Sequence, residues 1–419
     1  MVRVYRFAAV RPERSAAPTI AAVPYDVVTA DEARATIAKN PKSFLRVSRS
    51  DAEFPHLPHN DDRVYRRARD NFLAMLKEGS MRRDTVPSMY MYRVRQDDET
   101  FSGLCCCLDV DDYRNNTIRK HEQTRYDKEE DRTRHIEITR THNGPVVLLY
   151  RDLFGISPFI HSLGPPDSEP DAEVRTESGA LHQIFRISDP EVLARLETLF
   201  AGIPCLYIAD GHHRAKSAVN VADRDRTGHG GDEINRFMGV LFAHDRVRIH
   251  GYSRLLSNTG VYTADAFLQQ LKNHFDVVPC GAVDNRGVTI LPKIKHAHLY
   301  HVIHMYLGGR WYECSCPVDH SAAALDSLDV AVLQKYVLEE LLGINDPRID
   351  SRLQYLGGSR PLADLEHMVD TGEAAVAFAL QPVHIDTILA IADADSVMPP
   401  KSTWFEPKLL SGLLVHTFE

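Results

Sequence analysis

The chain has 419 residues, 43% hydrophobic and 26% charged, which is typical of a folded protein of roughly two or three domains. Its formal net charge of −9 argues against general binding to nucleic acids or anionic membranes, which needs clustered positive charge. No apolar run approaches the roughly 18 residues of a membrane span. The N-terminal residues also lack the apolar core of a secretion signal. We therefore expect a cytoplasmic protein without a membrane partner.

Seven cysteines are present, and Cys105, Cys106 and Cys107 are consecutive. Neighbouring side chains on a strand point to opposite faces, so this triplet is poorly suited to disulfide formation. We expect reduced cysteines, in agreement with a cytoplasmic location. Cys314 and Cys316 lack a second Cys/His pair at zinc spacing, and this favours ordinary strand residues over a metal site.

Apolar periodicity and turn residues predict the elements of the first half of the chain. In chain order they are a helix over 33–39 capped by Thr29 or Asp31, an amphipathic helix over 61–79, two strands within 89–113 around a turn at 96–100, a strand over 145–152, a proline-rich loop over 156–173, a strand pair around Ser178-Gly179 and a helix over 191–200.

The second half alternates strands and helices in the same way. We predict a buried strand over 203–209 followed by a helix over 215–219, a strand over 236–245, a helix over 264–275, a hairpin over 299–314 turning at Gly308-Gly309 and a helix over 328–343. The irregular alternation predicts an α+β (mixed α/β) fold. A composition shift near 255–262 suggests two domains, 1–255 and 256–419.

The turn at 210–214 joins the buried strand to the helix and holds Asp210, Gly211, His212, His213 and Arg214. Backbone N–H groups at such a turn bind anions, and glycine permits their close approach. The histidines and the arginine can donate to phosphate oxygens, whereas the aspartate can accept a proton or hold a metal ion. In the alternative interpretation Asp210 only caps the helix and the histidines are exposed. Five such residues together favour a functional site.

A second cluster lies at 120–134 and offers His121, Glu122 and Arg125. Charge runs of this kind are usually a solvated helix face, but His121 and Glu122 precede the helix-like part, where a loop would carry them into a pocket. We predict that this cluster shares one pocket with Asp210.

Two further segments contain proline turns with polar residues. In 399–412 paired prolines stiffen the approach to Lys401, which is a candidate phosphate ligand. In 23–34 Tyr25 and Asp26 follow Pro24, and they form either a turn signal or part of a site.

These motifs in their order resemble one large bacterial and archaeal family, the domain of unknown function numbered one thousand and fifteen, which is often labelled ParB-like. The residues that carry the resemblance span nearly the whole chain: PYDVV (24–28), SFLRVSR (43–49), DVDDY (109–113), KHEQTR and KEEDR within 120–132, ADGHHR (209–214) and PPKSTWFEPK with SGLL within 399–414.

The 210–214 turn also resembles the nucleotide-phosphate turn of the ParB/sulfiredoxin superfamily, which includes sulfiredoxin, ParB CTPases and an archaeal free-serine kinase. Sulfiredoxin has a nucleophilic cysteine where this chain has His212, so sulfinic-acid reduction is not expected. ParB proteins continue into a helix-turn-helix with a basic recognition helix, which we do not find here, so a nucleic-acid partner is not expected. The free-serine kinase carries an Asp-Gly-His-His-Arg run at this turn.

The resemblance implies a ParB/sulfiredoxin-like nucleotide-binding core with insertions in 1–255, and a C-terminal α/β region whose 399–412 segment returns to the site. It also implies a phosphotransferase that uses ATP or ADP and Mg²⁺ and acts on a small hydroxylated metabolite such as a free amino acid. By that resemblance Asp210 lies near the acceptor hydroxyl, and His212, His213 and Arg214 face the nucleotide phosphates. The residues themselves add further candidates: Glu122 and His121 with Asp210 as catalytic residues, and Asp26 as another candidate base. They also add Gly211, Arg125 and Lys401 as nucleotide ligands, and Asp210 and Glu122 as metal ligands.

Two other functions stay open. One is a ParB-like, nucleotide-switched protein that binds DNA or another protein. The other is a metal-dependent hydrolase that uses His121, Glu122, His212 and His213.

Overall fold

The computed structural model describes residues 1–165, 167–225, 231–280, 291–293, 299–358 and 360–418. Their contacts divide the chain into two compact units. The first unit contains Met1–Lys120, Thr124–Val247 and Pro407–Glu419, and the second contains His121–Gln123 and Arg248–Glu406. Among the described residues, no helix has both the length and the apolar character required to cross a membrane.

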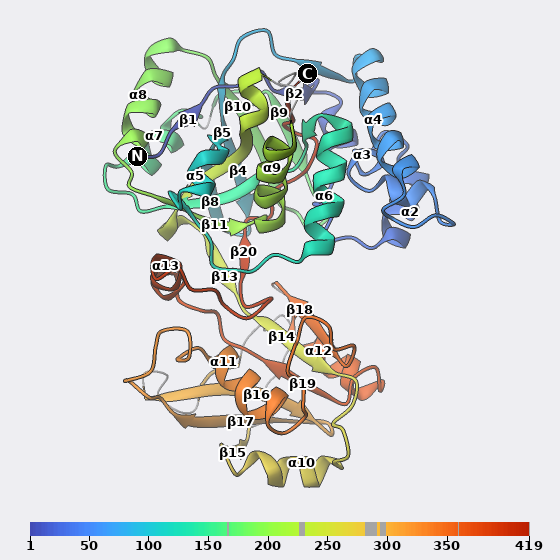
Figure 1. Cartoon of the computed structure of the whole chain (residues 1–419), viewed down its shortest axis with the longest axis vertical. Helices are drawn as coiled ribbons and strands as arrows, with labels where there is room; N and C mark the ends of the chain where they lie inside the picture. Colours follow the sequence, from blue (N-terminus) through green and yellow to red (C-terminus); the bar gives the residue numbers. More distant parts are fainter. Residues whose placement is uncertain (166, 226–230, 281–290, 294–298, 359, 419) are drawn as a thin grey trace. The chain divides into compact units, whose positions relative to one another are not determined.

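A mixed sheet forms the centre of the first unit, with strands in the order β6-β11-β8-β12-β5-β4-β10-β9 and β1 paired to β5 (Figure 1). Two small sheets, β2-β3 and β21-β7, accompany it. The strands are β1 (Val4–Tyr5), β2 (Val10–Pro12), β3 (Met81–Arg83), β4 (Met89–Gln96), β5 (Glu99–Asp109), β6 (Ile118–Arg119), β7 (Thr141–His142), β8 (Val146–Tyr150), β9 (Ala172–Arg175), β10 (Leu181–Ile187), β11 (Leu206–Asp210), β12 (Arg236–Ala243) and β21 (His416–Thr417).

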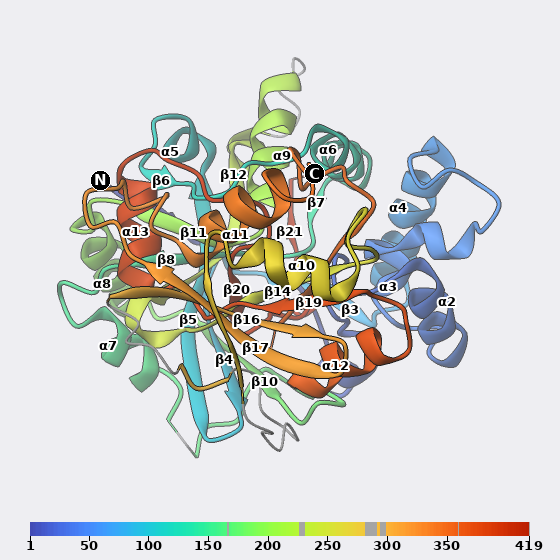
Figure 2. The ribbon, with the colours of Figure 1, turned by 90° about the horizontal axis from the view of Figure 1, so that it is seen from below.

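Helices cover this sheet, and two of them, α6 and α9, lie side by side in both views (Figures 1 and 2). The helices of the first unit are α1 (Ala17–Ile20), α2 (Ala30–Lys39), α3 (Leu45–Ser48), α4 (Asp62–Lys77), α5 (Val110–Arg114), α6 (Tyr126–Thr139), α7 (Ile156–Ser162), α8 (Pro190–Ala201) and α9 (His212–Arg224), with 3₁₀ turns η1 (Ser50–Glu53), η2 (Gly231–Asn235) and η3 (His244–Arg246).

A buried apolar cluster joins the sheet to α7, α8 and α9. From α9 it includes Ala215, Ala218 and Val219, which lie three and four residues apart and so face the same side of the helix. Leu206 and Ile208 of β11 belong to the same cluster. The core therefore fixes both β11 and α9, and with them the turn that connects the two elements.

The second unit is built on a six-stranded sheet in the order β15-β17-β16-β19-β14-β18, with a separate pair β13-β20. Its elements are β13 (Arg248–His250), β14 (Tyr252–Leu256), α10 (Ala264–Leu271), β15 (Asp276–Pro279), β16 (Tyr300–Leu307), β17 (Arg310–Pro317), α11 (Asp329–Leu333), the π-helical segment η4 (Gln334–Glu339), β18 (Leu353–Gly357), α12 (Leu362–Asp370), β19 (Val376–Ala379), α13 (Ile385–Asp393) and β20 (Trp404–Glu406).

The structure confirms the α+β class and most of the predicted elements. Thr29 caps α2 with a capping box, and the β16–β17 hairpin turns at Gly308 and Gly309, both at positive φ. The loop prediction for 156–173 is wrong over its first part, where α7 forms. Asp152 accepts hydrogen bonds from the backbone N–H groups of Ile156 and Ser157, which have no partner within the first turn of α7, and so stabilises the start of this helix. The helix predicted over 328–343 is α11 continued by a π-helical segment.

Candidate functional site

The turn after β11 has the predicted strand–glycine–helix geometry. β11 ends at Asp210, α9 begins at His212, and Gly211 between them has φ +95°. A β-bulge between Ile208 and Asp210 shifts the register against β8 and so changes the direction of the chain at the end of β11. A Cβ on Gly211 would lie 2.9 Å from Arg214 Nε. Glycine is therefore required here both by its backbone angle and by the closeness of Arg214.

Asp210 forms two ion pairs at this turn. Arg214 donates from Nη2 to Oδ2 at 2.6 Å, and Lys408 donates from Nζ to Oδ1 at 3.0 Å. Burial alone would raise the pKa of Asp210, but the charges of and hydrogen bonds from Lys408 and Arg214 hold that pKa well below its ordinary value. Asp210 is consequently a carboxylate at every physiological pH and holds two cations at the end of β11.

The helices α6 and α9 are parallel, and their N-terminal ends meet beside this turn. Three pairs with nearly constant separations of 88, 88 and 87 residues align them: Arg125–His213, Ser217–Glu129 and Arg224–Glu137. In the first pair the backbone N–H of Arg125, the residue before α6, donates to His213 Nε2 at 3.0 Å. Two helix N-termini thus direct their partial positive charge to one place, which favours an anion.

Tyr25 and Arg132 lie close to Arg214, which brings the 23–34 segment and the helix α6 to the same region. The guanidinium of Arg132 lies 4.3 Å from the centre of the Tyr25 ring. Burial and the charge of Asp26 raise the pKa of Tyr25, whereas the charges of Arg132 and Arg214 lower it less. The phenol is therefore protonated and available as a hydrogen-bond donor.

A small cavity of about 20 Å³ lies among these side chains, with space for one water molecule. Its lining includes Tyr25, Arg132, His142, Asn143 and Arg214. Within the described residues, Arg214 Nε, Asn143 Nδ2 and His142 Nε2 are buried without a hydrogen-bond partner. An unsatisfied buried donor costs about 1–3 kcal/mol, so the cavity favours a water molecule or an anion oxygen.

Three of the predicted site residues belong to the second unit. His121 packs its ring 6.0 Å from that of Phe405, and its carbonyl accepts the N–H of Met398 at 2.8 Å. Glu122 forms a parallel bridge with Met398. Lys401 has φ 55°, and its ammonium lies 5.4 Å from the centre of the Tyr252 ring. The roles predicted for His121, Glu122 and Lys401 stay predictions.

Lys408 contacts Asp210 although no local sequence pattern predicts it as a site residue. It lies seven residues after Lys401 in the same proline-containing segment, and the chain returns to the first unit at Pro407. The signal available in the sequence was its cationic side chain next to Pro407. Nothing local indicates a contact with Asp210, 198 residues away.

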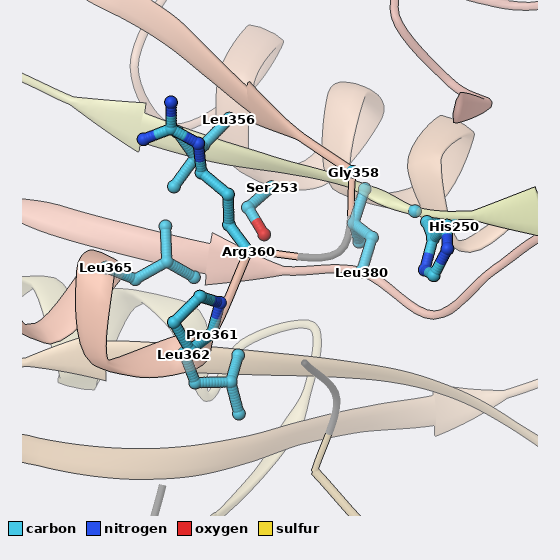
Figure 3. Close-up of a pocket in the computed structure, with 10 residues that line it drawn as sticks. His250, Ser253, Leu356, Gly358, Arg360, Pro361, Leu362, Leu365 and Leu380 are labelled. Atoms are coloured by element: carbon cyan, nitrogen blue, oxygen red, sulfur yellow. The ribbon is translucent and has the colours of Figure 1, made fainter. Parts of the chain in front are cut away.

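Two further cavities lie elsewhere. One, of about 20 Å³, is in the second unit, where His250, Ser253 and Arg360 meet leucines from β18, α12 and Leu380 (Figure 3). The other, of about 270 Å³, is in the first unit and is lined by residues that include Ser102, His161 and Arg246. Ser102 Oγ lies 3.0 Å from His161 Nδ1. Neither cavity contains a residue of the predicted site.

Comparison with known proteins places the chain in a family. The model of the family described as "protein of unknown function (DUF1015)" matches residues 4–331, and the chain belongs to that family. No curated protein sequence matches the chain.

Several solved structures are similar to the chain. A conserved hypothetical protein from Pyrococcus furiosus is 13% identical, covers 72% of this chain and 90% of its own, and has a TM-score of 0.33. A mutant free serine kinase in complex with ADP is 12% identical, with coverages of 75% and 91% and a TM-score of 0.37. C-terminally truncated SbnI from Staphylococcus aureus is 11% identical, with coverages of 72% and 82% and a TM-score of 0.34.

Proposed function

We propose that the first unit binds a nucleotide through its phosphates at the β11–α9 turn, and that the protein is a phosphotransferase acting on a small hydroxylated metabolite such as a free amino acid. The observation that carries the proposal is the meeting of two helix N-termini with Arg214 and Lys408 at Gly211. Phosphoryl transfer depends mainly on positioning and on neutralising phosphate charge, and these groups supply both.

The nucleotide would be held by backbone N–H groups of the first turn of α9, with His213 and Arg125 at its edge. Arg214 and Lys408 are cations already positioned by Asp210, so their charges are oriented before a ligand arrives. Such preorganisation lowers the cost of binding. The resemblance of the 210–214 turn to that of the free-serine kinase points to ATP or ADP as the nucleotide.

Asp210 is best explained as the residue that holds these cations. A general base works best with a pKa near the operating pH, and the pKa of Asp210 lies well below it. Both of its oxygens accept from a cation, which disfavours Mg²⁺ at the same carboxylate. The roles of Asp210 and Glu122 as Mg²⁺ ligands therefore stay predictions.

A phosphotransferase also needs a group near the acceptor hydroxyl. Glu122, His121 and Asp26 stay candidates from the sequence, and of these Asp26 lies in the first unit, close enough to Arg214 for its charge to act on that guanidinium. We propose Asp26 as the first to test, because Asp26→Asn keeps the shape of the side chain and removes its basicity together with its negative charge.

The test is calorimetric titration of the full-length protein with ATP and ADP, with and without Mg²⁺. Arg214→Ala should weaken binding by about 10-fold to 100-fold, the equivalent of a charge-assisted contact of roughly 1.5–3 kcal/mol. The matched control is Arg224→Ala at the other end of α9, where the arginine pairs with Glu130. If both variants bind like the wild type, the turn is not the phosphate site.

Turnover requires a second assay, in which nucleotide consumption is measured over a panel of amino acids, sugars and small alcohols. Stimulation by one hydroxylated acceptor, and its loss in Asp26→Asn with nucleotide affinity unchanged, would support the phosphotransferase. Nucleotide binding without any stimulating acceptor would instead favour a nucleotide-switched binding protein.

A further inference from the structure

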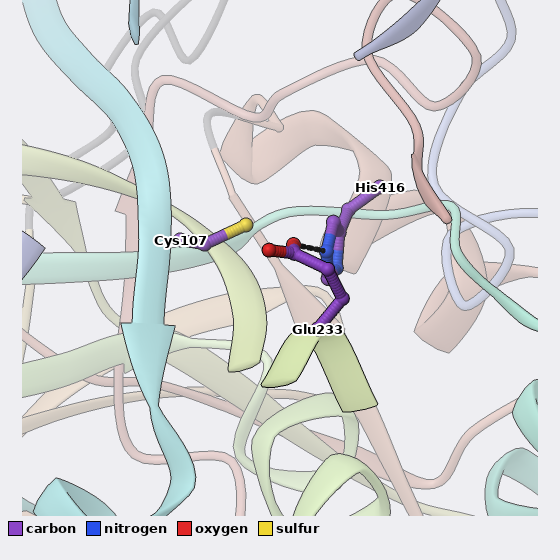
Figure 4. A group of neighbouring side chains, drawn as sticks. All are labelled: Cys107, Glu233 and His416. Carbon is purple, nitrogen blue, oxygen red and sulfur yellow. Dashed lines mark hydrogen bonds and ion pairs between the residues drawn. The ribbon is translucent and has the colours of Figure 1, made fainter. Parts of the chain in front are cut away.

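A second cluster of reactive side chains lies in the first unit and shares no residue with the ion pairs of Asp210. Cys107 of β5, Glu233 of η2 and His416 of β21 each offer one ligand atom, and these atoms all lie within 4.8 Å of one another (Figure 4). Three segments that are far apart in the sequence therefore meet at one point. Figure 4 shows the sulfur of Cys107 directed towards the carboxylate of Glu233 and the ring of His416.

We propose that Cys107, Glu233 and His416 bind a divalent transition-metal ion of the zinc class, with a fourth coordination position open. Zinc prefers thiolate, imidazole and carboxylate ligands, and three protein ligands leave one position for water or another small ligand. Ligand atoms around a tetrahedral zinc lie about 3.3–3.8 Å apart, as follows from its bond lengths. The cluster is therefore within a small side-chain movement of a metal geometry.

The sheet register explains why Cys107 takes part and its neighbour Cys106 does not. Cys106 belongs to the apolar cluster on one face of β5, and its neighbour Cys107 therefore points to the other face. Cys107 pairs with Met238 of β12, so Arg236, two residues before Met238, lies on the same face. This face holds the polar groups of the cluster.

The surroundings orient the carboxylate for binding. Arg236 donates from Nη1 to Glu233 Oε1 at 2.6 Å, which leaves Oε2 directed at His416 Nε2, 2.7 Å away. The side chain of His416 is 1% exposed and that of Glu233 38% exposed, so the cluster is buried at the histidine and accessible at the glutamate. Glu233 is thus the ligand through which the cluster meets solvent.

Charge also favours a dication. Binding would release the proton of the Cys107 thiol, and the resulting thiolate would join the Glu233 carboxylate, which is shared with Arg236, in facing the metal. Without metal, burial and the neighbouring Glu233 charge raise the pKa of Cys107, so the thiol stays protonated. His142 lies beside the cluster with its ring centre 5.4 Å from that of His416. His142 Nε2 and His416 Nδ1 are both buried without a hydrogen-bond partner in the described part of the chain.

The alternative is a hydrogen-bonded His–Glu pair beside an inert thiol. Metal-free full-length protein titrated with Co²⁺ distinguishes the two, because a cysteine ligand produces thiolate-to-cobalt charge-transfer absorption. We expect one ion per chain with that absorption, displacement by Zn²⁺, and a rise in melting temperature with Zn²⁺ by mass action. Cys107→Ala should abolish the absorption, and the control Cys106→Ala should retain it.

Glu233→Gln keeps the size of the side chain and its contact with Arg236. It should weaken Co²⁺ binding by more than the roughly 10-fold to 100-fold that loss of an outer-shell partner costs. Circular dichroism of each variant establishes that it is folded. Absence of Co²⁺ binding in the wild type would overturn the proposal, as would equal affinity in the wild type, Cys107→Ala and Glu233→Gln.

Discussion

Asp210→Asn is the most informative single change, because Asp210 is the shared partner of Arg214 and Lys408. The substitution keeps the shape of the side chain and removes the negative charge that balances two cations. If Asp210 holds those cations in place, the variant should lose stability even without a ligand. A carboxylate that serves only as a base would have a much smaller effect on folding.

The size of the loss follows from burial. Removing one partner of a buried ion pair costs about 3–5 kcal/mol, whereas surface pairs contribute about 0–1 kcal/mol. The side chains of Asp210, Arg214 and Lys408 are 25%, 11% and 23% exposed, so the cluster lies between these limits. We expect a loss of about 2–3 kcal/mol. For a domain of roughly 250 residues this corresponds to a fall in melting temperature of about 4–12 °C.

The same ion pairs predict a pH dependence. The folded-state pKa of Asp210 is lowered, so its contribution to stability is present above the unfolded-state pKa of about 3.9 and is lost as the pH falls from there towards the folded-state value. In Asp210→Asn this part of the acid transition should be missing. The difference in stability between wild type and variant should therefore be constant from about pH 5 upwards and shrink below pH 4.

Thermal unfolding of both proteins over this pH range is the assay, with Asp127→Asn as control. Asp127 pairs with Arg125 at 3.0 Å, but those side chains are 57% and 48% exposed, so its loss should cost less than about 1 kcal/mol. Phosphate should stabilise Asp210→Asn more than the wild type, because it replaces the missing charge. Equal stability of wild type and Asp210→Asn at pH 7 would refute the positioning role of Asp210.

Two other substitutions test the surroundings of the site. Gly211→Ala should lower the stability by about 1–2 kcal/mol because of its positive φ, and it should also lower nucleotide affinity because the new Cβ displaces Arg214. The control Gly179→Ala has a similar φ of +89° and nothing within 4 Å of the new Cβ, so parallel unfolding and binding measurements should show the stability loss alone. Burial, together with the charge of Arg132, lowers the pKa of His135 to about 4, so folding stability should fall as the pH drops from about 6.5 towards 4. In His135→Gln the free energy of urea unfolding should depend less on pH over that window. An unchanged dependence of that free energy on pH would contradict this prediction.

The sequence predicted those parts of the site that depend on local pattern. The apolar run before Asp210 and the glycine after it are sufficient to indicate a strand, a turn and a helix. Contacts between residues far apart in the sequence could not be predicted in this way, because side-chain identity alone does not show which cation reaches which carboxylate. For this reason the sequence favoured Lys401 as the phosphate ligand, although Lys408 is the lysine that contacts Asp210. The helix α7 was missed because Pro158 suggested a loop, although proline is tolerated in the first turn of a helix.

The proposed metal ligands illustrate the same limit more sharply. Sequence recognition of zinc sites relies on two ligands a few residues apart, so that one turn or hairpin presents both. Here Cys107, Glu233 and His416 come singly from three elements, and each is unremarkable in its own segment. Only the register of β5 with β12 and the return of the chain to β21 bring the three together.

The returning segment 407–419 connects both candidate sites, since it supplies Lys408 to Asp210 and His416 to Glu233. It is also buried against the N-terminal residues, where Val415 exchanges backbone hydrogen bonds with Val10 at 2.9 Å in each direction. The first unit therefore reaches its folded state only after the chain has passed through 248–406 and returned. Because this contact spans almost the whole chain, a protein ending at Glu406 should lose the Val415 partner of Val10 and the Lys408 partner of Asp210 and expose apolar core. We expect limited proteolysis of that truncated protein to degrade the first unit while the second unit resists. Resistance of residues 1–247 equal to that of the full chain would show that the first unit folds without its C-terminal strand.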